Sequence, residues 1–253
     1  MILDVEQTRE NLHRKDINTA LIPCTRLQYD SYDWFGRCEA VLAEKDEINP
    51  EVVLIGDSIT HFWGGKPNFG VHTYHPSYDE TFAGMRVMNI GYGWDRTQNM
   101  LYRITKGKQL EGINPKIVVI NAGTNNTSTT EEARENTAEE IAEGVAEVTS
   151  SEVIAQFRQR FPSIHVVLMA IFPREHEPTH QRRILIENTN KILKEYAAKH
   201  SALTYVDLWD KMLTPEGKLP QEICGDYCHP TEEGYKIWGA ALRPILLELL
   251  KYV

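Results

Sequence analysis

Short apolar runs recur along the chain, and longer stretches with apolar residues at helical spacing separate them. The runs are Val52–Ile55, Arg86–Ile90, Ile117–Ile120, His165–Ile171 and Leu203–Val206. Because apolar residues follow one another in these runs instead of alternating with polar ones, each is typical of a strand buried on both faces.

The stretches between the runs predict helices. We expect one that begins near Asp30 or Ser31, others over Arg96–Lys106, Glu131–Arg160 and His180–His200, and a last one from about Thr231. Pro244 should kink or split the last helix, because proline removes a helix hydrogen bond. Strands that alternate with helices indicate an α/β fold, in which a parallel sheet of about five strands is covered by helices on both faces.

The 253 residues suffice for one α/β domain or two small ones. Neither an internal repeat nor a linker rich in Pro, Gly or Ser divides the sequence. We therefore expect a single domain over residues 30–253, preceded by an N-terminal arm over residues 1–29.

Composition and charge exclude several classes of protein. The hydrophobic fraction of 42% and the charged fraction of 25% are ordinary for a globular domain. A formal net charge of -9 argues against nucleic acid as a partner, since phosphate binding requires clustered Lys and Arg. A membrane span is not expected, because the sequence has no run of about 20 apolar residues.

The N-terminus and the cysteines bear on the compartment. Residues 1–15 are polar and mixed in charge, unlike a secretory signal. We expect a cytoplasmic protein, or a secreted or periplasmic one if a signal peptide has been removed. Four cysteines are too few for a disulfide framework in a chain of this length, and Cys224 and Cys228 are expected to be reduced thiols instead of a strained local disulfide.

Ligands of open parallel sheets bind at the carboxyl ends of the strands, so the residues after each run are the candidates for chemistry. Small or polar clusters follow the first three runs, and another precedes the last helix: Gly56-Asp57-Ser58-Ile59-Thr60, Asn89-Ile90-Gly91-Tyr92-Gly93-Trp94-Asp95, Gly123-Thr124-Asn125-Asn126 and Asp226-Tyr227-Cys228-His229. Together they supply a hydroxyl, an amide, an acid and an imidazole, the groups that acyl transfer needs.

Ser58 is the candidate nucleophile, and it needs a base because a serine hydroxyl reacts poorly at neutral pH. His229 can take its proton, and Asp226, three residues earlier, can hold the other ring nitrogen. The Asn125 amide and the Ser58 backbone N–H are candidate donors to the oxyanion of the tetrahedral intermediate. The structural alternative is that Ser58 caps a helix, Asn125 lies in a turn and His229 is a surface histidine.

These four clusters, in this order, resemble the four blocks of the SGNH hydrolases, also called GDSL lipases or esterases. Arg96-Thr97, followed by Leu101-Tyr102-Arg103, resembles the branch that contains the catalytic subunits of platelet-activating factor acetylhydrolase. The resemblance implies a flavodoxin-like three-layer α/β/α sandwich and a Ser–His–Asp triad that works without a cofactor. It also implies an oxyanion hole made of the Ser58 N–H, a backbone N–H of the second block and the Asn125 amide.

The second block departs from the family's pattern. Alignment on Asn89 and Asp95 puts Trp94 where the family usually has its oxyanion glycine. The Trp94 N–H can still serve as a donor, although its side chain would change the pocket wall, and Gly93 is the alternative donor. The α/β-hydrolase motif G-x-S-x-G does not fit, because Thr60 stands where the second glycine is required.

Residues beside these positions have two interpretations. Asp57 either contacts substrate or braces the turn through backbone hydrogen bonds. Asp95 is expected to cap the helix that follows it. Residues 61–82 form an aromatic-rich insertion that includes Trp63, and this insertion serves as a substrate wall or as local packing. Asn126 is predicted, like Asp57 and Trp63, to bind substrate.

The sequence therefore predicts a carboxylic-ester hydrolase that removes short acyl groups, acetyl above all, with a carbohydrate as a candidate acceptor. A thioesterase, a lysophospholipase-like enzyme and a non-enzymatic binding module are the alternatives. The expected partner is a small-molecule ester, and a homodimer is compatible with the sequence. We expect no cofactor and no metal, since the pairs His72/His75 and His176/His180 lack further ligands at matching spacing.

Overall fold

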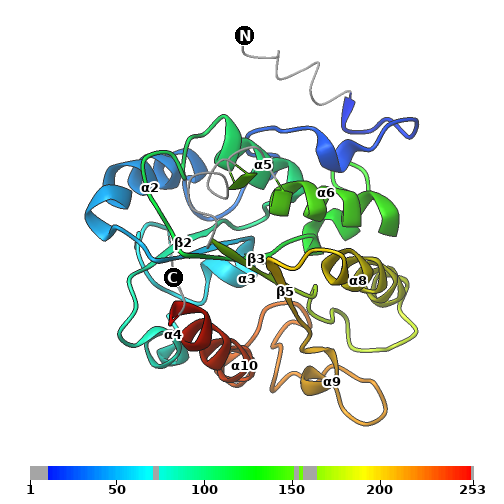
Figure 1. Ribbon diagram of the computed structural model, residues 1–253. Helices are drawn as coiled ribbons and strands as arrows, with labels where there is room; N and C mark the ends of the chain where they lie inside the picture. The colour runs from blue at the N-terminus through cyan, green and yellow to red at the C-terminus, as the bar shows by residue number, and fades with distance from the viewer. Residues whose placement is uncertain (1–10, 71–73, 151–153, 156–163, 252–253) are drawn as a thin grey trace.

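A five-stranded sheet with all strands parallel forms the centre of the computed structural model, which describes residues 11–70, 74–150, 154–155 and 164–251 (Figure 1). The strands are β1 (Val52–Gly56), β2 (Val87–Gly91), β3 (Ile117–Asn121), β4 (His165–Met169) and β5 (Leu203–Val206). Their order, β2-β1-β3-β4-β5, is that of flavodoxin-like folds. The predicted fold class and the five predicted strands are confirmed.

Alternate residues of each strand point into two separate apolar clusters, one on each face of the sheet. Val53 and Ile55 of β1 enter the cluster on what we call the first face, whereas Val52 and Leu54 enter the cluster on the second face. This division follows from the pleat, which sends successive side chains to opposite sides. The strands are therefore mostly apolar, as expected for a sheet covered on both faces.

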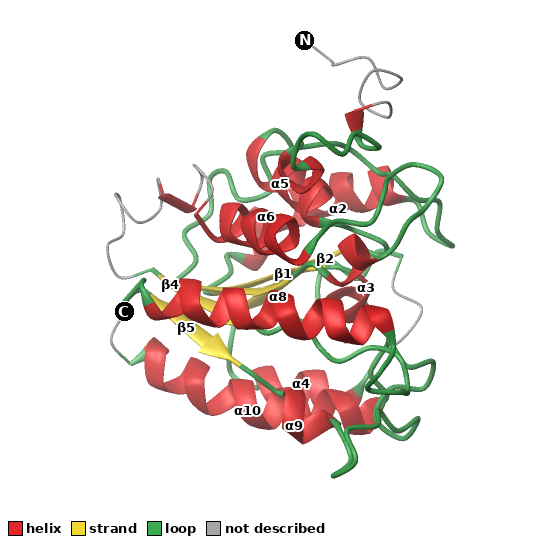
Figure 2. Cartoon of the chain, turned by 90° about the vertical axis from the view of Figure 1, so that its right-hand side faces the viewer, coloured by secondary structure: helices red, strands yellow, loops and turns green. Residues whose placement is uncertain are grey.

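Among the described elements, one set of helices covers the first face and another set covers the second (Figure 2). The first face carries α2 (Trp34–Ile48), α5 (Thr97–Thr105), α6 (Ala138–Ser150) and α8 (Gln181–Ala198). The second face carries α3 (Ser58–His61), α4 (Pro76–Phe82), α9 (Trp209–Met212) and α10 (Glu232–Leu250). The three-layer sandwich agrees with the expectation from the sequence.

Several helix boundaries differ from those predicted. Asp33, not Asp30 or Ser31, caps α2, because its side chain accepts the Phe35 N–H. α6 begins at Ala138, and part of the range predicted beyond Ser150 lies outside the described residues. Of the two effects predicted for Pro244, a split of the last helix does not occur, since α10 runs continuously through this residue.

Two short helices complete the described elements, η1 (Thr19–Leu21) and η2 (Thr124–Thr127). η1 lies against the first-face helices, where the Thr97 hydroxyl donates to the Ala20 carbonyl at 2.8 Å. Near it, Leu12, Cys24 and Ala133 form a small third apolar cluster. Residues 11–29 are thus anchored to the first face by both polar and apolar contacts.

The outer edge of β2 is covered by the segment that precedes it in the chain. Lys66 forms a parallel bridge with Met88, and its carbonyl accepts the Asn89 N–H at 2.7 Å. Within the described part of the chain, no helix is long and apolar enough to cross a bilayer. All four cysteines are free thiols in the structure.

Candidate active site

Ser58 lies at the sharp turn between β1 and α3. Gly56 ends the strand beside Gly91 of β2 and Asn121 of β3. A Cβ on Gly56 would come within 2.0 Å of the Thr60 hydroxyl, so only glycine allows the chain to turn this closely. The turn presents the Ser58 hydroxyl at the carboxyl edge of the sheet, where ligands of such folds bind.

The other two candidate triad residues reach Ser58 from the loop before α10. Nε2 of His229 lies 2.8 Å from Oγ of Ser58, and Nδ1 of His229 lies 2.7 Å from Oδ2 of Asp226. Thr231 caps α10 two residues after His229, which fixes the end of the loop. The structure thus brings together the hydroxyl, the imidazole and the carboxylate in the order that general-base activation requires.

Asp226 is held as an acceptor for the loop as well as for the ring. Its Oδ1 accepts the backbone N–H groups of Cys228 at 3.0 Å and His229 at 2.7 Å. Burial acts to raise the pKa of Asp226, but these hydrogen bonds and the His229 ring outweigh it, so the pKa lies below its ordinary value. Asp226 is therefore ionised at neutral pH and can stabilise a protonated His229.

Asn125 and Trp94 supply candidate oxyanion donors on the other side of Ser58. One N–H of the Asn125 amide donates to the Asp95 carbonyl at 3.0 Å, which fixes the amide and leaves its second N–H for a ligand. The Trp94 N–H has no acceptor among the described residues, whereas the Gly93 N–H donates to Nδ1 of His61 at 3.3 Å. Of the two predicted alternatives, Trp94 is therefore the one left available.

Trp94 has a left-handed backbone with φ of 63°, and its indole is 41% exposed. Glycine adopts the left-handed conformation freely, whereas for a residue with a Cβ this conformation costs about 1–2 kcal/mol. The geometry explains why glycine suits this position, and the tryptophan adds an aromatic wall to the site.

These groups surround a cavity of about 220 Å³. The lining residues are Asp30, Ser58, Phe62, Trp94, Asn125, Arg174, Cys228 and His229. Phe62 packs on His229 with 5.2 Å between ring centroids. Burial raises the pKa of Cys228 to about 12, so its thiol stays protonated and does not compete with Ser58 as a nucleophile.

Three residues predicted to bind substrate are fully buried and do not line this cavity. Trp63 is fully buried on the second face, where it stacks on Trp238 with 4.3 Å between ring centroids. Asn126 is fully buried and bonds Thr97 of α5. Asp57 caps α3 by accepting the Ile59 N–H. This contact agrees with the alternative interpretation, in which Asp57 braces the turn.

Asp95 also differs from its predicted role as a helix cap. Its carboxylate accepts from Nε1 of Trp34 at 2.8 Å and Nε of Arg103 at 2.7 Å, with the ion pair almost fully buried. The N–H of Arg96, the residue that caps α5, is instead satisfied by the Asn99 side chain. Asp95 therefore ties α2 to α5 and positions Asn125 through its carbonyl.

Sequence reasoning missed Arg174 entirely and gave Asp30 and Cys228 no part in the site, whereas Phe62 belongs to the insertion that it offered as a substrate wall. Arg174 follows β4 closely in the chain, so the rule that points to strand ends would have found it had it been applied to the fourth run. Cys228 is the direct neighbour in sequence of His229, and Phe62 lies four residues after Ser58. Asp30 lies before α2 and reaches the site only through tertiary packing.

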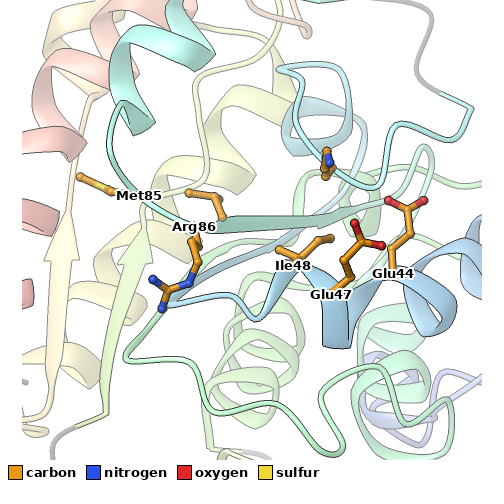
Figure 3. A pocket seen from close by; sticks show the side chains of 7 residues that line it. Glu44, Glu47, Ile48, Met85 and Arg86 are labelled. Atoms are coloured by element: carbon orange, nitrogen blue, oxygen red, sulfur yellow. The ribbon is translucent and has the colours of Figure 1, made fainter.

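A second, larger hollow of about 330 Å³ lies near the start of β2 (Figure 3). Glu44, Glu47 and Ile48 of α2 line it together with Arg86 and Met85. Its lining has no Ser, Cys or His side chain, and it lies at the amino end of the strand. Among the described residues, no three His, Cys, Asp or Glu side chains gather as a metal site would require.

Known proteins resemble this chain over most of its length. It is 29% identical over 219 residues to platelet-activating factor acetylhydrolase IB subunit alpha1 of Bos taurus, which covers 86% of this chain and 84% of the relative. It is 25% identical over 237 residues to the alpha2 subunit of Rattus norvegicus, with 93% of both chains covered. The crystal structure of a GDSL-like lipase from Bacteroides thetaiotaomicron has a TM-score of 0.59 at 21% identity and covers 85% of this chain and all of that one.

A sequence profile of the GDSL-like lipase/acylhydrolase family matches residues 54–237, from β1 into α10. The matched range includes Ser58, Asn125, Asp226 and His229. Because the profile spans more than half of the chain, the protein belongs to the GDSL-like lipase/acylhydrolase family.

Proposed function

We propose that the protein is a carboxylic-ester hydrolase that removes short acyl groups by a covalent mechanism at Ser58. The observation that carries the proposal is the continuous chain of contacts from Ser58 Oγ through His229 to Asp226, with distances of 2.8 and 2.7 Å. Membership of an acylhydrolase family supports the reaction class.

In the first half-reaction, His229 takes the Ser58 proton while Oγ attacks the ester carbonyl. Asp226 holds the ring nitrogen that does not react and stabilises the positive charge on the imidazole. The negative oxygen of the tetrahedral intermediate accepts from the N–H groups of Ser58 and Trp94 and from the Asn125 amide. His229 then gives the proton to the leaving alcohol, and an acyl-enzyme remains.

In the second half-reaction, water attacks the acyl-enzyme with His229 again as the base. The same donors stabilise the second tetrahedral intermediate, whose collapse returns the proton to Ser58 and releases the acid. Each half-reaction uses the side chains in the positions that they already occupy, so no rearrangement of the triad is needed.

The size of the cavity favours a small acyl group, acetyl above all. A volume of about 220 Å³ bounded by Phe62 and Trp94 leaves little room for a long chain. The relatives named as acetylhydrolases support the same choice. Our first candidate for the substrate is an acetylated sugar. Its alcohol part, the sugar, would extend toward solvent.

A fluorophosphonate probe and an aryl acetate test the mechanism together. The wild-type protein should be labelled at Ser58 and should hydrolyse phenyl acetate, and Ser58→Ala should abolish both. Asp226→Asn should lower kcat by about 10⁴-fold, because the histidine is then held in the wrong tautomer. Cys228→Ala is the control and should still be labelled. Labelling of Ser58→Ala equal to wild type would refute Ser58 as the nucleophile.

A series of aryl esters with acetyl, butyryl and octanoyl groups, together with an acetyl thioester and acetylated sugars, tests the substrate class. We expect kcat/KM to fall as the acyl chain lengthens. A maximum at octanoyl would favour a lysophospholipase-like enzyme, and a preference for the thioester would favour a thioesterase.

A further inference from the structure

We propose that Arg174 determines specificity by binding an anionic group of the ester, a proposal that rests on the proposed hydrolysis at Ser58. Arg174 lies in the loop after β4 and lines the same cavity as Ser58 and Asn125. Its guanidinium is part of the substrate site and takes no part in the triad.

Strand order places the charges of the cavity on different sides of the nucleophile. Ser58 follows β1 and Asn125 follows β3, whereas Trp94 follows β2 and Arg174 follows β4, the next strand beyond β3. Asp30 belongs to the β2 side, since its carboxylate packs against Gly93. A substrate bound across Ser58 therefore meets a carboxylate toward β2 and a guanidinium toward β4.

The guanidinium of Arg174 has donors to spare. It makes one long hydrogen bond of 3.4 Å, from Nη1 to the Thr124 carbonyl, and within the described residues no carboxylate forms an ion pair with it. A guanidinium carries five N–H donors, so most of them face the cavity or solvent. Buried Arg37, by contrast, donates to four backbone carbonyls and has little left to offer a ligand.

The backbone of Arg174 is fixed although its side chain is not saturated. Nε of Arg183 donates to the Arg174 carbonyl at 2.7 Å, and Nη1 of Arg183 donates to the Gly217 carbonyl at 3.0 Å. A fixed backbone with unused donors is the preorganised arrangement that favours ligand binding over internal packing.

The charge of the whole protein makes this cation significant. A net charge of -9 repels an anionic substrate, so a local positive charge is needed to accept one. The positive charge of Arg174 also acts on Cys228 in the same cavity. Burial raises the pKa of Cys228, and the charge of Arg174 is the largest effect that lowers it. Arginine also matches the planar geometry of carboxylate and phosphate oxygens.

Matched ester pairs provide the test. We would compare kcat/KM for phenyl acetate with that for 4-acetoxybenzoate and 4-acetoxyphenyl phosphate, which carry the charge on the leaving group. Phenyl butyrate and monophenyl succinate form the pair with the charge on the acyl group. In Arg174→Gln, which keeps a donor for the Thr124 carbonyl, the anionic-to-neutral ratio should fall about 10- to 100-fold for at least one pair, as expected for loss of a charge-assisted hydrogen bond.

Arg182→Gln is the matched control. Arg182 donates to the Thr127 carbonyl of the same turn at 3.1 Å, but it pairs with Glu175 and does not line the cavity. Its substitution should leave the anionic-to-neutral ratio unchanged. Added salt should reduce the anionic preference of the wild-type protein and not that of Arg174→Gln.

The possible outcomes separate the two proposals. If wild type does not hydrolyse the neutral esters or the charged ones, the proposed function fails and the role of Arg174 fails with it. If the neutral esters are hydrolysed and Arg174→Gln leaves every anionic-to-neutral ratio unchanged, only the role of Arg174 is overturned. An equal loss on neutral and anionic esters would show that Arg174 positions the Asn125 turn and does not bind substrate. The ester pair whose ratio changes shows whether the anionic group is a carboxylate or a phosphate. It also shows whether that group belongs to the acyl part or to the alcohol part of the ester.

Discussion

The two faces of the sheet support the site in different ways. On the first face, Arg37, Arg103 and Asp95 are almost completely buried and form a network of directional hydrogen bonds around the ends of β1 and β2. On the second face, Trp63 stacks on both Trp238 and Tyr235, with 4.3 and 5.4 Å between ring centroids. Polar bonds organise one face, and aromatic packing organises the other.

Each kind of support suits the groups that depend on it. The first face holds the proposed oxyanion donor Asn125, because the Asp95 carbonyl accepts from its amide and the Asp95 carboxylate is fixed by Arg103. The second face holds α10, whose start follows His229, and the Tyr235 hydroxyl ties α10 to the Ile59 carbonyl at 2.7 Å. Damage to the second face should therefore reduce stability, whereas loss of a donor on the first face should reduce the rate of the chemical step.

The largest expected effect is on the second face. Trp63→Ala should lower the free energy of unfolding by about 3–5 kcal/mol, because it opens a large cavity between α4 and α10. Urea denaturation measures this loss, and kcat of the folded protein at low temperature should change little. Phe69→Ala is the control from the same insertion, since Phe69 is 37% exposed and should cost far less. A large fall in kcat with unchanged stability would contradict the division between the faces.

The next effect concerns the donors. Asn125→Ala should lower kcat by about 10²–10³-fold, equivalent to about 2.7–4 kcal/mol of transition-state stabilisation, because one oxyanion donor is lost. Stopped assays with phenyl acetate at saturating substrate measure it. Asn126→Ala is the matched neighbour and should instead lower stability by about 1–3 kcal/mol, since it leaves buried partners such as the Thr97 N–H unsatisfied. If both variants affected only stability, Asn125 would have no part in the chemistry.

The smallest effect concerns Asp57, at the boundary between the two faces. Burial raises its pKa to about 7 from an ordinary value of 3.8, so the folded protein keeps a proton that the unfolded chain loses between these values. Stability from this group is therefore complete below about pH 3.8 and is lost as the pH rises toward 7.

Asp57→Asn removes that titration and keeps an oxygen to cap α3. Between pH 5 and pH 6.5, the free energy of unfolding of wild type should fall by about 2 kcal/mol relative to Asp57→Asn, at up to about 1.36 kcal/mol per pH unit. Chemical denaturation at several pH values measures the difference. Relative to Asp226→Asn, which keeps Asp57, the stability of wild type should not fall over this pH range, because the pKa of Asp226 is lowered and not raised. Parallel pH curves for wild type and Asp57→Asn would show that Asp57 is ionised throughout.

The fold was predictable because its strands are buried on both faces and therefore appear as uninterrupted apolar runs, as in Val52–Gly56. The residues now gathered around Ser58 were identifiable because parallel strands all end at the same edge. The identification of His229 depended on more than its immediate sequence. Only Asp226, three residues earlier, and its position before the last helix distinguished it from a surface histidine.

The errors arose where tertiary contacts override local chemistry. Asp95 has the position of a helix cap, but its carboxylate instead accepts hydrogen bonds from the buried side chains of Arg103 and Trp34. Trp63 leaves the sheet beside the nucleophile, and only the position of α10 decides that it turns into the core. Arg174 follows the fourth run closely enough for the strand-end rule to find it, but its unused donors are visible only in the structure.

The bridge between Lys66 and Met88 has a consequence for self-association. A strand at the edge of a sheet offers unpaired N–H and C=O groups to any other chain, which makes it a template for aggregation. Here the Lys66 carbonyl already occupies the Asn89 N–H, so a foreign strand that approached β2 would have to displace a segment of the same molecule. At the opposite edge, β5 is only four residues long. One edge of the parallel sheet is thus covered by the chain itself, and the other edge is a strand too short to pair extensively. We therefore expect the protein not to aggregate through its sheet edges in concentrated solution.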